Sequence, residues 1–120
     1  MATAEISAEA PVLTLINVFT VAPEKQAQLV ELLERATRDV MQVRPGFISA
    51  SIHRSIDGTR VTNYAQWRDR AAFDAMLQDE EARAHMTAAA ALAMKFEPVL
   101  YTVASVHAGR AGMTGADVPR

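Results

Sequence analysis

Hydrophobic residues fill both alternating sets of positions in residues 12–21, the first regular segment of the chain. Successive side chains of a strand point to opposite faces, so each set belongs to one face of a sheet. A strand with one face in water carries polar residues at every second position, and this segment does not. The sequence therefore predicts a strand covered on both faces, with Leu13, Leu15, Phe19 and Val21 on one face and Val12, Ile16 and Val18 on the other.

The hydrophobic spacing changes after residue 22 to that of an amphipathic helix. Apolar residues recur three or four positions apart, and charged residues fill the opposite side. Pro23 suits the first turn of a helix, and Arg44-Pro45-Gly46 is typical of a helix end. The sequence predicts a helix over residues 23–43 with a buried stripe of Leu29, Leu32, Leu33, Ala36, Val40 and Val43.

Two more strands are predicted at residues 47–55 and 60–68. They are joined by a hairpin turn at Asp57-Gly58, because this pair tolerates the positive φ angles of such turns. Both segments alternate in polarity, as strands of an antiparallel pair do.

The second half of the chain contains two helical patterns and a last strand. Asp69 and Asp79 each precede one helical pattern, and an aspartate in this position caps a helix by accepting a hydrogen bond from its first turn. The last strand is predicted at residues 96–106.

The element order β-α-β-β-α-β predicts a ferredoxin-like α+β fold, with a four-stranded antiparallel sheet and helices on one face. The domain is expected to span residues 12–107, and residues 1–11 and 108–120 are expected to be flexible. Helices on one face leave the opposite face of the apolar first strand uncovered. The simplest cover is the same face of a second copy, so we expect a homodimer.

Composition excludes several classes of protein. The chain has 120 residues, a net charge of −2 and no cysteine, which excludes disulfides, thiolate nucleophiles and zinc–thiolate sites. No basic stripe is present, so we expect no nucleic-acid partner. The longest apolar run, residues 88–94, is too short for a membrane span of about 20 residues. Because no signal peptide is recognisable either, we expect a cytoplasmic protein.

The candidate chemistry lies on one face of the predicted sheet. Asn63 and the only tryptophan, Trp67, have the same parity, and Asn17 has the parity of its apolar neighbours Leu15 and Phe19. A buried amide without a hydrogen bond costs roughly 1–3 kcal/mol, so these amides need either protein partners or a ligand. Trp67 either fills the core or borders a ligand.

Further residues are candidates for substrate contact: Phe19, Phe73, Met76, Leu77, His85 and Met86. The helical apolar residues among them also fit a core, and His85 is either an exposed helix residue or a proton carrier. Tyr64, another candidate, has the opposite parity to Asn63 and fits a dimer interface better. The three histidines are too scattered for a metal site, and no carboxylate joins them at ligand spacing.

Four stretches within residues 13–107 make the chain resemble the antibiotic biosynthesis monooxygenase (ABM) family of dimeric α+β barrel proteins: Ile16-Asn17-Val18-Phe19, Arg44-Pro45-Gly46-Phe47, His53-Arg54-Ser55, and Asn63-Tyr64-Ala65-Gln66-Trp67. Members include cofactor-independent monooxygenases that oxidise anthrone-type polyketides to quinones with O₂. The resemblance implies active-site roles for Asn17, Asn63 and Trp67.

Other relatives degrade haem and bind its iron with a histidine about ten residues beyond the tryptophan. Here that stretch, residues 73–77, contains no histidine, so haem degradation is not expected. The resemblance implies a cofactor-free monooxygenase that converts an electron-rich aromatic, an anthrone or hydroquinone, to a quinone. The alternatives are a non-oxidative isomerase and a dimer that binds a small ligand without turnover.

Overall fold

A computed structural model describes residues 1–110 of the chain. Its centre is one antiparallel sheet with the strand order β2-β3-β1-β4. This confirms the predicted ferredoxin-like fold. The strands are β1 (Leu13–Thr20), β2 (Phe47–Arg54), β3 (Arg60–Trp67) and β4 (Lys95–Tyr101).

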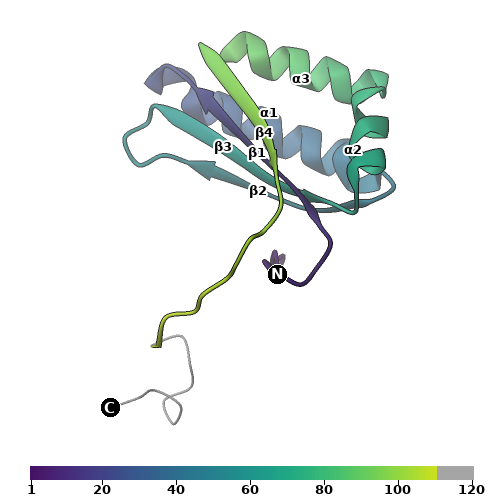
Figure 1. The fold of residues 1–120 in the computed structure, drawn as a ribbon. Coiled ribbons are helices and arrows are strands. Elements are labelled where there is room, and N and C mark those ends of the chain that lie inside the picture. The colour runs from purple at the N-terminus through teal and green to yellow at the C-terminus, as the bar shows by residue number, and fades with distance from the viewer. Residues whose placement is uncertain (111–120) are drawn as a thin grey trace.

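All helices cover the same face of the sheet (Figure 1). The first crossover consists of a 3-10 turn at Pro23–Lys25, helix α1 (Gln26–Asp39) and a second 3-10 turn at Met41–Val43. The second crossover consists of α2 (Arg70–Leu77) and α3 (Glu80–Leu92). The predicted caps are confirmed, because the side chain of Asp69 accepts from the Ala72 N–H at 2.8 Å and that of Asp79 accepts from the Ala82 N–H at 2.9 Å.

Two predicted boundaries were wrong. Helix α1 ends at Asp39, because Val40 leaves the helical region with φ −122° and ψ −55°; Val43, predicted to be buried, is 74% exposed. The last strand ends at Tyr101 and does not reach residue 106. Strand β4 lies at the sheet edge and pairs only with β1. The last pair between the two strands joins Tyr101 of β4 to Thr14, near the start of β1. No neighbouring strand remains for the residues beyond it.

The core fills the layer between the sheet and the helices. One cluster surrounds Trp67 and includes Phe73 and Met76 of α2, and a second surrounds the fully buried Leu29 of α1. The β1 and β3 residues in both clusters all have the same parity, as the alternation predicts. The sheet face toward the helices is therefore the buried face of the domain.

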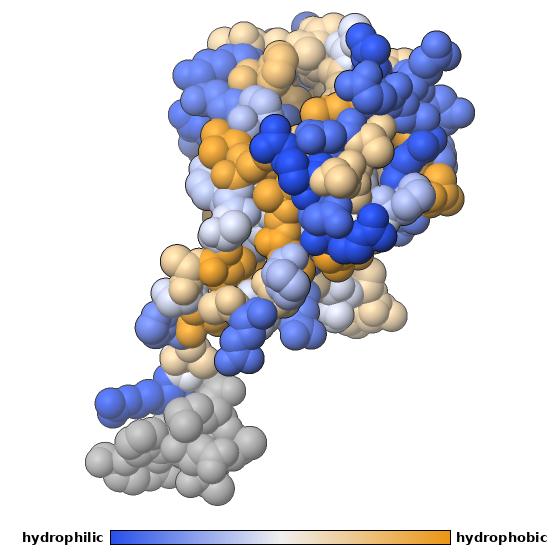
Figure 2. Space-filling view, turned by 45° about the vertical axis from the view of Figure 1, so that its right-hand side comes forward, coloured by the Kyte–Doolittle hydropathy of each residue, from blue (hydrophilic) through white to orange (hydrophobic). Residues whose placement is uncertain are grey.

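The opposite sheet face carries hydrophobic side chains that the single chain leaves partly exposed. Val99 and Tyr101 of β4 are each 45% exposed, and Ile16, Val18 and Tyr64 are half-buried. Hydrophobic residues reach the surface among polar ones in the view of Figure 2. The N-terminal segment and residues 102–110, which follow β4, lie on this side, away from the helices (Figure 1).

The N-terminal segment contacts β3. Residues 1–11 form no helix or strand, and the carbonyl of Glu5 accepts a hydrogen bond of 2.6 Å from the Gln66 side chain. The predicted flexible tail, residues 108–120, lies almost entirely outside the described residues. No helix within residues 1–110 has the length and apolarity needed to cross a membrane.

The predicted turn between β2 and β3 contains a carboxylate with an altered pKa. Gly58 has the expected positive φ of 81°. Hydrogen bonds from the Thr59 hydroxyl, the Thr59 N–H and the Ser55 hydroxyl lower the pKa of Asp57 to about 2, from an ordinary 3.8. A folded-state pKa below the unfolded value stabilises the fold above pH 4, and this contribution disappears as the pH falls toward 2.

We expect the Asp57→Asn variant to unfold at a lower urea concentration than the natural protein at pH 7, and the difference to shrink between pH 4 and pH 2. Asparagine still accepts hydrogen bonds but lacks the charge that strengthens them. Urea unfolding at pH 7, 4, 3 and 2 tests this. A difference that is the same at pH 7 and pH 2 would contradict the assigned pKa.

Candidate active site

Two asparagines face each other across the centre of the sheet. Asn17 of β1 and Asn63 of β3 are direct partners in the antiparallel register. Side chains paired in this way have Cβ atoms roughly 4.5–5.5 Å apart and point to the same face. The Oδ1 atoms of both are buried and have no hydrogen-bond partner within the described protein. An orphaned buried acceptor is costly, so two of them side by side indicate a place where a ligand donates hydrogen bonds.

Trp67 ends β3 on the same face as Asn63. Its side chain is 2% exposed and is held between two aromatic rings in edge-on contact: Phe47, at a centroid distance of 5.3 Å, and Phe73, at 6.2 Å. It lies four positions along the strand from Asn63, a span of about 13 Å. The asparagine pair and the indole therefore lie along one line on the sheet, which suits an elongated, flat ligand.

A cavity of about 370 Å³ lies over this line, between the sheet and the three helices. This volume is within the usual range of small-molecule sites, about 300–1,000 Å³. Small side chains on the facing elements leave the space open: Ala36 of α1, Ala89 and Ala90 of α3, and Ala50 and Ala65 of the sheet. The lining is mostly apolar, so a bound aromatic molecule would be shielded from water.

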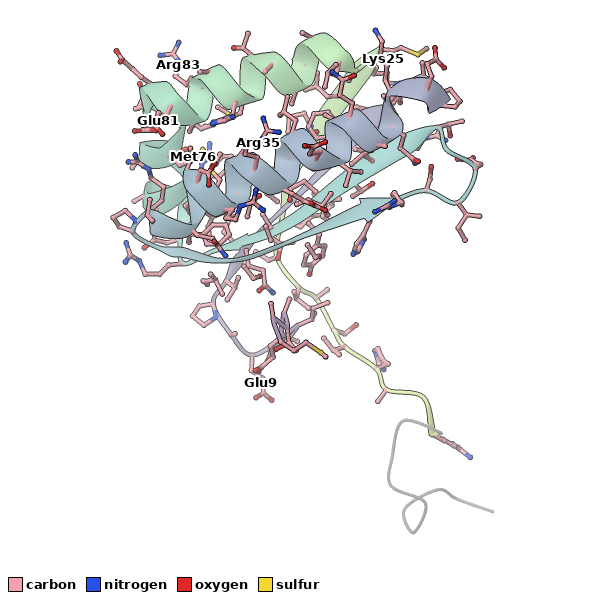
Figure 3. The ribbon with its side chains drawn as sticks, turned by 180° about the vertical axis from the view of Figure 1, so that it is seen from behind. Glu9, Lys25, Arg35, Met76, Glu81 and Arg83 are labelled. Carbon is pink, nitrogen blue, oxygen red and sulfur yellow. The ribbon has the colours of Figure 1, made fainter. Side chains whose placement is uncertain are left out.

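The structure brings almost all of the candidate residues to this one cavity. Asn17, Asn63 and Trp67 line it, together with these candidates for substrate contact: Phe19, Phe73, Met76, Leu77, His85 and Met86. In Figure 3, Met76 is seen between α1 and the α2–α3 segment, whereas Arg83 points away from the sheet. Phe73 and Met76 belong both to the core and to the cavity wall, so the two interpretations of these residues do not exclude each other.

Tyr64 is the exception. It does not line the cavity, because its position between Asn63 and Ala65 directs it to the opposite face of the sheet. This position does not fit the expectation that Tyr64 contacts the substrate. It does fit the expectation from parity that Tyr64 lies on the other face from Asn63. Its half-buried side chain lies on the face that carries Ile16 and Val18.

The sequence did not point to the contribution of α1, β2 and β4 to the cavity. Their lining residues are Leu33, Ala36, Thr37 and Met41 of α1 and its following turn, Phe47 and Ala50 of β2, and Phe96, Pro98 and Leu100 of β4. The β4 residues could have been found by parity, since Pro98 is the register partner of Asn17. The α1 residues look like ordinary core positions in the sequence.

The polar groups of the cavity are few. Among the described residues that line it, only Asn17, Asn63, Thr37, His85 and Trp67 carry a polar side-chain atom, and the Thr37 hydroxyl already donates to the Leu33 carbonyl at 2.8 Å. Within residues 1–110 no cluster of three or more histidine, cysteine, aspartate or glutamate side chains is placed to hold a metal ion. The site offers hydrogen bonds and apolar contact.

Comparison with known proteins gives consistent matches. Residues 12–88 match the family model described as antibiotic biosynthesis monooxygenase. The chain is 49% identical over 82 residues to tetracenomycin-F1 monooxygenase of Streptomyces glaucescens. The aligned region covers 68% of this chain and 73% of that protein.

Solved structures with the same fold include two from other Streptomyces species. A mutant of SnoaB, a cofactor-independent oxygenase from Streptomyces nogalater, superposes with a TM-score of 0.71 at 29% identity and covers 81% of this chain and 97% of its own. A monooxygenase from the gene ActVA-Orf6 of Streptomyces coelicolor, in complex with nanaomycin D, superposes with a TM-score of 0.69 at 28% identity. The superposition covers 83% of this chain and 93% of that monooxygenase.

Proposed function

This chain belongs to the antibiotic biosynthesis monooxygenase family, and from that premise we propose that it is a cofactor-independent monooxygenase that oxidises an anthrone- or hydroquinone-type aromatic to a quinone with O₂. The observation that carries the proposal is the pair of buried Oδ1 atoms of Asn17 and Asn63, which have no hydrogen-bond partner within the described protein and lie in an apolar cavity that Trp67 also lines. The named relatives support the reaction class, since they are described as monooxygenases or as a cofactor-independent oxygenase.

The chemistry can be written without an added cofactor. An anthrone that loses one proton from its CH₂ group becomes an electron-rich anion, which gives one electron to O₂. The substrate radical and superoxide combine to form a C–O bond, and the resulting peroxide takes up a proton. Loss of the second C–H proton with cleavage of the O–O bond gives a carbonyl and water. In total, CH₂ and O₂ become C=O and H₂O.

The protein's contribution is orientation and electrostatic stabilisation. Amide N–H groups and an indole N–H can donate hydrogen bonds to the oxygen on which negative charge develops, and amide oxygens can accept from phenolic hydroxyls. Asn17 and Asn63 offer both kinds of group at neighbouring positions on the sheet. The surrounding apolar residues exclude water, which strengthens these hydrogen bonds and holds the aromatic plane in one orientation.

Turnover under air and under nitrogen separates this proposal from its alternatives. We expect a simple anthrone to be converted to its anthraquinone under air only, with the change followed by absorbance. An isomerase would act equally well under nitrogen. A binding protein would change the fluorescence of Trp67 on ligand addition and form no product. Conversion under air that is no faster than the spontaneous rate would overturn the proposal.

We also propose that the working enzyme is a homodimer in which the open sheet faces of two copies pack together. The support is the partly exposed apolar surface of Ile16, Val18, Tyr64, Val99 and Tyr101, on the face that the helices leave free. Burial of apolar area contributes about 25 cal/mol per Å², so covering such a face favours association.

We expect a sedimentation mass of twice the 13.0 kDa of one chain at micromolar concentration. The Ile16→Lys variant should shift this mass to that of one chain, because it introduces a charge at the centre of the proposed interface. The matched control is Ile56→Lys, at a fully exposed position in the hairpin turn. A natural protein that sediments as a single chain would refute the dimer.

A further inference from the structure

One side chain of the cavity stands apart from the others in its chemistry. Among the described residues that line the cavity, His85 is the only one that can take up a proton near neutral pH. It lies on α3 between the buried Ala82 and Ala89, three and four residues away, which places it on the stripe that α3 turns toward the sheet. The side chain is half-buried, so it borders both the cavity and the solvent.

The proposed reaction requires a proton acceptor that the asparagines cannot provide. An amide is not basic at neutral pH, and the indole of Trp67 carries only a donor. The remaining lining residues are apolar, apart from the hydroxyl of Thr37, which is already bonded to the Leu33 carbonyl. A positioned imidazole, in contrast, is the side chain that most often removes a proton in general base catalysis.

We propose that His85 is the general base of this site. This inference rests on the proposed function. A ring nitrogen of His85 takes the proton from the substrate CH₂ or phenolic OH group: an N–H bond forms, the C–H or O–H bond breaks, and its electron pair stays on the substrate. After O₂ has added, the imidazolium returns the proton to the peroxide anion. Because the side chain is only half-buried, His85 can exchange protons with solvent between turnovers.

The charges around His85 all lie outside the cavity. Helices α1 and α2 pack against α3 and present apolar residues and Thr37 to the cavity, and the sheet presents the neutral Asn17 and Asn63. The charged residues adjacent to these positions are exposed: Glu81 and Arg83 on α3, Glu34 and Arg38 on α1, and Asp74 on α2. No side chain from these elements is therefore placed to take over the proton within the described part of the cavity.

The test measures proton removal separately from oxygen chemistry. Anthrone is incubated under nitrogen in deuterium oxide, and NMR follows exchange of its CH₂ protons with the natural protein, with His85→Gln and with His107→Gln. His107 is an exposed histidine beyond β4 and serves as the control. We expect His85→Gln to slow the catalysed exchange by about 100-fold, in line with the loss of a general base, and His107→Gln to leave it unchanged.

Oxygen uptake under air with the same proteins completes the experiment. In His85→Gln, kcat/KM for oxygen uptake should fall as well, because the oxidation begins with the same proton removal. In His85→Ala, added imidazole should restore part of the rate. Equal exchange in the natural protein and His85→Gln, or uptake without catalysed exchange, would overturn the role of His85 alone. Absence of both exchange and uptake would overturn the proposed function with it.

Discussion

Replacing Asn63 with alanine is expected to lower kcat for anthrone oxidation by roughly 100-fold or more and to leave the stability of the protein unchanged or increased. The loss follows from removing a hydrogen bond to the developing oxyanion, which costs about 10²–10³ in rate in comparable sites. The stability result follows from the buried Oδ1 atom, which has no partner in the described protein and therefore contributes no bond to the fold. Oxygen uptake and urea unfolding measure the two effects.

The partner residue and a neighbouring position provide the controls for this prediction. Because Asn17 and Asn63 are register partners, their alanine variants should be non-additive in kcat if both contact the same oxygen. Thr62→Ala, one position earlier on β3 and on the opposite face, should retain the natural rate. An Asn63→Ala protein that is destabilised and fully active would show that the amide serves the fold and not the reaction.

Replacing Gly46 with alanine is expected to destabilise the protein by about 2–6 kcal/mol. Gly46 precedes β2 with a φ of 82°, a region that costs other residues about 1–3 kcal/mol. An added Cβ would also collide with the Cβ of Ala72 in α2, and overpacking of this kind costs about 1–3 kcal/mol more. The Gly46 carbonyl also accepts the Arg68 N–H at 2.7 Å, which limits how far the backbone at Gly46 can move away from Ala72.

Gly58→Ala is the matched control, since Gly58 has nearly the same φ of 81° but only one neighbour for a Cβ, Pro23 at an ordinary 3.6 Å. It should show the backbone strain alone, about 1–3 kcal/mol. Urea unfolding of both variants separates strain from collision. Equal destabilisation of the two would mean that the close approach of Gly46 to α2 does not contribute.

The residues that the sequence placed correctly are those governed by strand alternation. The parities of Asn17, Asn63 and Trp67 are visible in the chain, and the structure brings all three to one cavity. Alternation also separates Tyr64 from them. The physical reason is that a strand reverses its side chains every residue, so the shared face of two positions follows from the difference in their numbers.

Strand β2 shows why alternation was not sufficient elsewhere. The register shifts between Phe47 and Ser49, and this irregularity lets Phe47 lie opposite Trp67 while Ala50, three residues later, lies opposite Ala65. Regular alternation would have placed Phe47 and Ala50 on opposite faces, yet both line the cavity. Bulges of this kind depend on the neighbouring strand and leave no clear mark in a single sequence.

The cavity itself could not be predicted for a related reason. It exists because small residues of α1 and α3, among them Ala36 and Ala89, oppose the centre of the sheet, and this depends on how the helices pack. In the sequence both residues read as ordinary helix positions. The end of β4 at Tyr101 likewise depends on where its partner β1 begins.

The most direct test of cofactor-free oxygenation is O₂ uptake by protein that has been stripped of metals and flavins, measured with a simple anthrone beside the Trp67→Phe variant. We expect one O₂ to be consumed for each anthraquinone formed, at a rate above the spontaneous reaction, and a lower rate for Trp67→Phe, which keeps an aromatic ring but loses the indole N–H. Uptake that appears only after a metal or flavin is restored, or none above the spontaneous rate, would contradict a cofactor-independent oxygenase.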